Sequence, residues 1–202
     1  GVYMTVVPLQ VIHGDHLAHV RGEPLAPAHD RVGVDVLAAR YPGLQSFRLK
    51  RLLEREVYDV QRGPERFLVD ARSGERLPRL DRDGAIALAT ALYQGAGEVA
   101  RVEWVTRAPS EVKTRPVPMW AVHFADRGST TLYLSPDSGE LLARRHSLWR
   151  WFDFLWMFHI MDYEQRTDVN NGLLRIASVI GLAFGLSGVW LLFYSLGQRR
   201  RA

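Results

Sequence analysis

Four side chains near the start of the sequence are of the types that bind metal ions. His13, Asp15, His16 and His19 lie close together in one short stretch. Imidazole nitrogens and carboxylate oxygens suit zinc, copper or iron, and a helix would place His16 and His19 on one face. The cluster predicts a metal site just outside a membrane. The alternative is a polar connector that leads the chain away from the bilayer.

A second distinctive stretch, Trp149–Tyr163, combines many aromatic rings with Asp153, His159 and Asp162. As a helix it would lie at a membrane surface, with its rings at the depth of the headgroups. A histidine near a membrane can also be a metal ligand when it faces a partner helix. We therefore expect an aromatic interfacial segment over residues 147–171, with His159 as its candidate ligand.

No pattern of catalytic residues accompanies these side chains. The sequence contains no G-x-S-x-G, no H-E-x-x-H and no glycine loop that would cradle a phosphate. It has no cysteine, which excludes disulfides, thiolate metal sites and thiol nucleophiles. The net charge is +4, but basic and acidic residues alternate along the chain, which argues against nucleic-acid binding. These features favour a binding protein over an enzyme.

The apolar residues gather near the carboxyl end, where no charge occurs from Ile176 to Leu196. A helix of this length covers about 30 Å, the thickness of a bilayer's hydrocarbon core. We predict a transmembrane helix within residues 172–197. Arginines at 199–201 follow it, and positive charge marks a cytoplasmic end. The basic tail, residues 198–202, is therefore expected in the cytoplasm, with the main domain outside a bacterial inner membrane.

Small residues form a stripe on this helix at Ala177, Gly181, Gly185 and Gly188. Such residues let a second helix approach closely. The neighbour could be an earlier helix, a second copy of the chain in a homodimer, or a cofactor. Residues 1–9 are apolar and are expected to be the end of a truncated earlier transmembrane helix, with a trimmed signal peptide or a buried strand as alternatives. Residues 10–30 are expected to form a connector.

Helical and alternating patterns recur in the same order between these ends. A Ser-Gly-Glu turn appears in Arg72–Leu77 and again in Asp137–Leu142. The pattern predicts an α+β fold of two tandem units, residues 31–82 and 83–146, each a helix and a three-stranded antiparallel sheet. The expected helices are 31–41 and 83–93, and the expected strands are 47–53, 56–61, 66–71, 99–106, 119–124 and 131–134.

The second unit and the segment after it resemble a known family. Val117–Phe124 and Thr130–Arg145 resemble the closing hairpin of the PepSY domain family, and Trp151–Tyr163 resembles the segment before the last membrane helix in its membrane-anchored branch. The resemblance implies a non-enzymatic, periplasmic module that binds or regulates a protein or peptide. Such a partner would lie along a sheet edge or in the groove between the units.

The same resemblance implies an alternative function. Some members belong to inner-membrane ferric or ferrisiderophore reductases, whose helices hold haem b through paired histidines. The histidine before their last membrane helix corresponds to His159 in this sequence. The glycine of that motif and the early histidine-bearing helix have no counterpart here.

Overall fold

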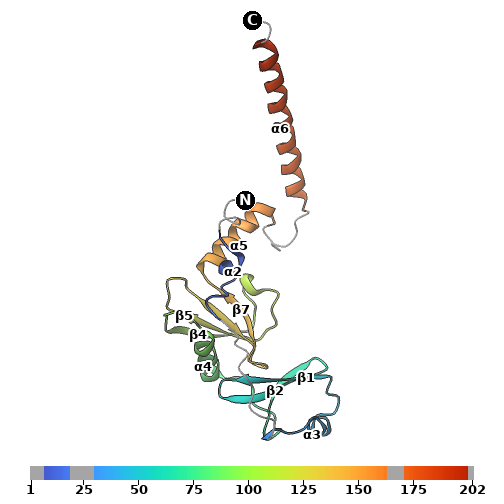
Figure 1. Cartoon of the computed structure of the whole chain (residues 1–202), viewed down its shortest axis with the longest axis vertical. Coiled ribbons are helices and arrows are strands. Elements are labelled where there is room, and N and C mark those ends of the chain that lie inside the picture. The colour runs from blue at the N-terminus through green and yellow to red at the C-terminus, as the bar shows by residue number, and fades with distance from the viewer. Residues whose placement is uncertain (1–6, 19–29, 163–170, 200–202) are drawn as a thin grey trace. The chain divides into compact units, whose positions relative to one another are not determined.

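The computed structural model of the chain describes residues 7–18, 30–162 and 171–199, with side chains through Tyr194. The chain forms two compact units, Gly1–Arg150 and Trp151–Ala202. Both sheets lie in the first unit, and the long apolar helix lies in the second (Figure 1). His19 of the expected metal cluster is outside the described residues, as are residues 1–6 of the expected truncated helix and the arginines at 200 and 201.

The first sheet consists of strands β1 (Ser46–Leu52), β2 (Arg55–Arg62) and β3 (Glu65–Asp70), antiparallel and in that order. Helix α3 (Val34–Arg40) precedes it. A small core joins them, because Leu37 and Tyr41 pack with apolar side chains of β2 and β3. The helix and three strands that the sequence predicts here are confirmed.

The second sheet has four antiparallel strands, in the order β4 (Val99–Val105), β5 (Met119–Phe124), β6 (Thr131–Leu134) and β7 (Leu141–Arg145). The expected three-stranded unit is therefore wrong by one strand. The sequence does not predict β7 because its apolar residues do not alternate with polar ones: Leu141 and Leu142 are adjacent. The pairing of β6 with β7 is also irregular between Tyr133 and Leu134.

Different segments cover the two faces of this sheet. Helix α4 (Arg82–Leu92) packs against one face, where Ala85, Leu88 and Ala89 join the core. The short 3-10 helix η2 (Ser110–Val112) lies on the other face, where Val112 joins a second small cluster. Alternate side chains of β5 therefore pack into two different cores, one on each face of the sheet.

Charged groups connect the two sheets. The carboxylate of Asp59 on β2 accepts hydrogen bonds from Lys50 and Arg66 of the same sheet. Lys50 also donates to the Ser138 carbonyl at 2.7 Å, and Arg66 reaches Glu140 at 2.7 Å. The second Ser-Gly-Glu turn is thereby held against the first sheet.

Three helices complete the described chain. Helix α2 (Leu9–Ile12) is short, and Ala18 after it forms an isolated bridge with Tyr93. Helix α5 (Ser147–Ile160) follows β7 directly. Helix α6 (Gly172–Arg199) contains a stretch, Gly172–Tyr194, that is long and apolar enough to cross a membrane, and none of its most apolar part is buried. The expected apolar helix at the carboxyl end is confirmed.

Candidate binding groove at an open sheet edge

Strand β7 forms one edge of the second sheet, and within the described ranges no strand pairs with its outer side. The hydrogen-bonding pattern shows which groups face outward. Phe124 donates to the Thr130 carbonyl at 2.8 Å, so Leu132, two residues further, also directs its main chain toward β5. Arg144 lies opposite Leu132. The N–H and C=O of Arg144 therefore point away from β6, toward the open edge.

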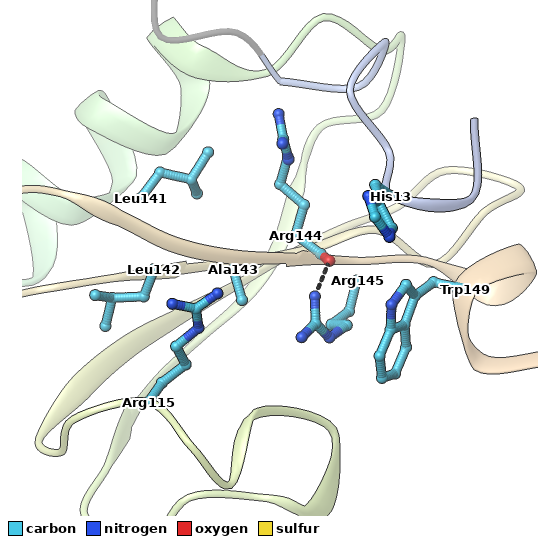
Figure 2. A pocket seen from close by; sticks show the side chains of 8 residues that line it. All are labelled: His13, Arg115, Leu141, Leu142, Ala143, Arg144, Arg145 and Trp149. Carbon is cyan, nitrogen blue, oxygen red and sulfur yellow. Dashed lines mark hydrogen bonds between the residues drawn. The ribbon is translucent and has the colours of Figure 1, made fainter. Parts of the chain in front are cut away.

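A cavity of about 430 Å³ lies along this edge (Figure 2). Strand β7 contributes five consecutive residues, and the rest of the lining comes from three separate segments. These are the turn after α2 with His13, the loop after η2 with Arg115, and the start of α5 with Trp149. The groove therefore depends on segments that are far apart in the sequence.

Arg145 is held in a defined position within the groove. Its Nε donates to the Glu111 carbonyl at 2.8 Å and its Nη1 to the Arg144 carbonyl at 2.7 Å (Figure 2). Its guanidinium carbon lies 3.9 Å from the centre of the Trp149 ring, a favourable cation–π arrangement. The two main-chain carbonyls and the Trp149 ring thus orient the guanidinium of Arg145.

Arg144 fastens the amino-terminal segment to the other side of β7. Its guanidinium donates to the Ala18 carbonyl at 2.5 Å and to the Asp15 carboxylate at 2.6 Å. The buried ring of His146 contacts the same segment through the Ile12 carbonyl at 3.1 Å. Burial lowers the pKa of His146 despite this hydrogen bond. These contacts place His13 at the mouth of the groove.

A carboxylate beneath the groove is already neutralised. Glu111 accepts hydrogen bonds from Arg150 Nε at 2.8 Å and from the Tyr133 hydroxyl at 2.7 Å. Burial alone would raise the pKa of Glu111, but the bonds from Arg150 and Tyr133 hold it below its ordinary value. Glu111 is therefore an ionised structural partner of Arg150.

The predicted metal cluster is only partly brought together. Asp15 pairs with Arg144, and the His16 ring packs against the His146 ring with centroids 6.1 Å apart. Among the described residues no group of three His, Cys, Asp or Glu side chains is arranged to hold a metal ion. His13 instead lines the groove. Because His19 lies outside the described residues, the metal site remains a prediction.

The other predicted positions lie in the second unit. His159 is exposed on α5, with its ring 6.4 Å from that of Trp156. It is the single histidine of residues 151–202, so this stretch offers one ligand where a paired-histidine haem site needs two. On α6, a Cβ added at Gly181, Gly185 or Gly188 would meet no atom within 4 Å. Ala177, the fourth member of the stripe, is half-buried.

Sequence reasoning missed the groove itself. The sequence patterns assign no role to the basic pair Arg144-Arg145, and they place Trp149 only in an aromatic run. The feature of the sequence that could have indicated the groove is a pair of arginines that follows apolar residues and precedes a tryptophan. Nothing local pointed to Arg115, because its contribution depends on how the loop after η2 folds over β7.

Comparison with known proteins found no matching family model, no similar curated protein and no similar solved structure. The functional argument therefore depends on the groove and on the apolar helix.

Proposed function

We propose that the chain is a membrane-anchored binding protein of the PepSY type, whose sheet-containing unit lies outside the bacterial inner membrane. Its function is to hold an extended segment of a protein or peptide partner against β7. In this mode the partner adds a strand to the sheet, so main-chain hydrogen bonds supply affinity and flanking side chains supply specificity. No chemical reaction is required of the site.

The observation that supports this proposal is an unpaired strand edge inside a cavity. The outer edge of β3 is already occupied, because Leu77 donates to the Leu68 carbonyl at 2.8 Å and Arg76 forms a bridge with Val69. β1 and β4 are also edge strands, but the groove described above lies along β7. Outward main-chain groups and a cavity of peptide-binding size coincide at β7.

The apolar helix supports the membrane part of the proposal. The span Gly172–Tyr194 is exposed along its apolar length, and a water-soluble protein would have to cover such a surface. A bilayer covers it without any further protein. The binding unit would then be confined to the membrane surface, where its partner is met.

Peptide selection on the full-length protein in lipid nanodiscs tests the function. Random ten-residue peptides would be selected, and the winners remade with N-methyl groups at alternate main-chain nitrogens. We expect N-methylation to weaken binding at least about tenfold, because it removes the donors that a strand needs. Hydrogen–deuterium exchange should slow at the amide of Arg144 when the unmodified peptide is bound.

Two results would contradict the proposal. One is equal binding of methylated and unmodified peptides, which would show that no strand is added. The other is protection that appears at β1 or β4 but not at β7, which would place the partner on another edge.

A further inference from the structure

We infer that strand β4 is the contact surface for a second copy of this chain, with the two β4 strands antiparallel about a two-fold axis at Val102. β4 forms the edge of the second sheet opposite β7 (Figure 1). The pairing joins the four-stranded sheets of two copies into one continuous sheet with a β7 groove at each end. Because β4 does not line that groove, the contact is independent of the proposed peptide partner.

The main chain of β4 offers hydrogen-bonding groups on its open side. Ala125 donates to the Glu98 carbonyl at 2.8 Å, so Ala121, four residues before Ala125, also directs its main chain toward β4. Glu103 lies opposite Ala121, and its main chain therefore faces β5. The N–H and C=O of the adjacent Val102 point away from β5, and within the described ranges no strand pairs with that side of β4.

The charges on β4 suit a second copy of the same strand. Arg101 and Glu103 are the two charged residues of β4. An axis at Val102 places Arg101 of each copy opposite Glu103 of the other, so both cross-strand pairs are attractive. An axis at Glu103 would place two carboxylates opposite each other, which is unfavourable. Arg101 also contacts Glu103 within one chain, so the pairing links two ion pairs into one network.

The other open edge strands lack this complementarity. β1 carries Arg48, Lys50 and Arg51 and no acidic residue. β7 carries Arg144 and Arg145 and no acidic residue. Self-pairing of either strand would bring cations together, and such charges keep the edges of neighbouring molecules apart. Among the described open edges, β4 is therefore the one that is complementary to itself.

An exposed tryptophan on β4 becomes covered in this pairing. Trp104 is 43% exposed, and its ring meets the Trp120 ring edge-on with centroids 4.8 Å apart. In the paired strands each Trp104 lies diagonal to Val102 of the other copy, within reach of an aromatic side chain. The ladder irregularity lies between Val99 and Arg101, so the strand is regular from Arg101 onward and Val102 keeps the alternation that the pairing needs.

Confinement favours a second copy over a strand from an unrelated protein. If α6 anchors the chain as proposed, all copies share one membrane plane, which raises their effective concentration. A short contact between sheet edges can then form even if it is weak in dilute solution. A two-fold contact also uses the same surface on both copies, so the assembly ends at a dimer.

Disulfide crosslinking of single-cysteine variants tests the register. The chain has no cysteine, and a residue on the axis has its two Cα atoms about 5.5 Å apart, within the range of a disulfide. Full-length Val102→Cys, Glu103→Cys and Glu54→Cys are oxidised with copper phenanthroline in phosphatidylcholine vesicles. We expect Val102→Cys to crosslink at least about fivefold faster than the others, because it alone faces itself. Glu54, which is 94% exposed in a turn, reports random collision.

Charge reversal tests the contact without a cysteine on the axis. Energy transfer between fluorophores at Glu54→Cys measures association of full-length chains in the same vesicles. Arg101→Glu should weaken association about tenfold, because by symmetry two cross-strand pairs become repulsive. Adding Glu103→Arg should restore association, since opposite charges again face each other. Arg127→Glu is the matched control, from an exposed position between β5 and β6, and should change nothing.

Three outcomes would overturn the inference. Crosslinking of Val102→Cys no faster than that of Glu54→Cys would mean that the copies meet only by collision. Faster crosslinking of Glu103→Cys would place the axis on a like-charge pair. Association that is unchanged in Arg101→Glu would mean that the copies are held elsewhere, for example through α6. Peptide binding at β7 should be the same in Arg101→Glu as in wild type, so a failure of the proposed function is read separately.

Discussion

Asp59 is the residue on which the charged contact between the two sheets depends. Its side chain is only 3% exposed, yet it carries hydrogen bonds from both Lys50 and Arg66. Burial alone would raise the pKa of Asp59, but these hydrogen bonds outweigh it and hold the pKa below its ordinary value. The pKa of Lys50 is lowered by burial, against the opposing effect of Asp59. Two cations therefore share one buried carboxylate.

Asp59→Asn should lower the free energy of unfolding by about 3 kcal/mol, since it leaves two cations without their buried counter-charge. The folded-state pKa of Asp59 lies below the unfolded value of about 3.9. Its stabilising effect is thus present above that pH and is lost as the pH falls through the folded pKa. Urea unfolding followed by tryptophan fluorescence should show that the difference in free energy of unfolding between wild type and variant becomes smaller below about pH 4.

Glu54→Gln provides the control for this measurement. Glu54 is 94% exposed and makes a long 3.5 Å pair with Arg51, so its loss should cost less than about 0.5 kcal/mol. If the loss of unfolding free energy in Asp59→Asn stays constant down to pH 3, the Asp59 carboxylate is not stabilised in its charged form by Lys50 and Arg66.

At the scale of elements, α4 illustrates how local chemistry sets a boundary. The Asp81 side chain accepts a hydrogen bond from the Gly84 amide at 2.8 Å and caps the helix. The helix then presents Ala85, Leu88 and Ala89 to the sheet. Its start therefore follows from a capping residue and the spacing of apolar side chains, both of which are visible in the sequence.

Asp81→Ala should destabilise the first unit by about 1 kcal/mol, because an amide of the first turn loses its acceptor. Thermal unfolding monitored by circular dichroism of the full-length protein measures this. Asp81→Asn keeps a capping oxygen and should be close to wild type. Equal losses in both variants would mean that the negative charge, not the cap, stabilises the helix.

Helix α5 presents an exposed apolar face. Trp151, Phe154 and Phe158 recur at helical spacing, with exposed fractions of 62%, 51% and 62%. Only residues 161–171 separate the end of this helix from α6, so a chain anchored by α6 keeps α5 near the bilayer. We propose that this face contacts a lipid surface.

Quenching by brominated lipids tests the position of α5. In nanodiscs, Trp151→Phe should reduce the quenched fraction of tryptophan fluorescence, because it removes an emitter at headgroup depth. Trp104→Phe is the matched control from β4 of the sheet-containing unit, and it should raise that fraction. An unchanged fraction in Trp151→Phe would show that this face does not contact lipid.

The predictability of the fold follows the strength of each local pattern. β5 and β6 have the predicted bounds, because their apolar residues are bordered by clear turns. β7 was missed because adjacent leucines and a ladder irregularity hide its alternation. The groove was missed for another reason. Arg115 comes close to β7 only in the folded chain, and no spacing of residues in the sequence predicts that proximity.

At the scale of the whole molecule, an apolar helix follows a unit built from two sheets. The chain has no cysteine, so its fold needs no oxidising compartment, and the compartment must be measured directly. The same absence makes the measurement simple, since any introduced cysteine is the single thiol.

Labelling with a membrane-impermeant maleimide tests the proposed orientation. Glu54→Cys places a thiol in an exposed turn and should react in intact spheroplasts, if the sheet-containing unit lies outside. Ala202→Cys should react only after the membrane is permeabilised, because the arginines before it favour the cytoplasm. The reverse pattern would invert the orientation and place the groove in the cytoplasm.

The contacts at the start of α5 have a mechanical consequence. Ser147 donates to the Gly128 carbonyl at 2.7 Å, and Arg150 bonds to Glu111 and to the Ser129 carbonyl. Tension applied at the carboxyl end of the chain would reach these contacts before it reaches β7. If α6 anchors the chain and a partner strand pairs with β7 as proposed, these contacts would bear a pull on the chain first, and the paired strand would stay in register.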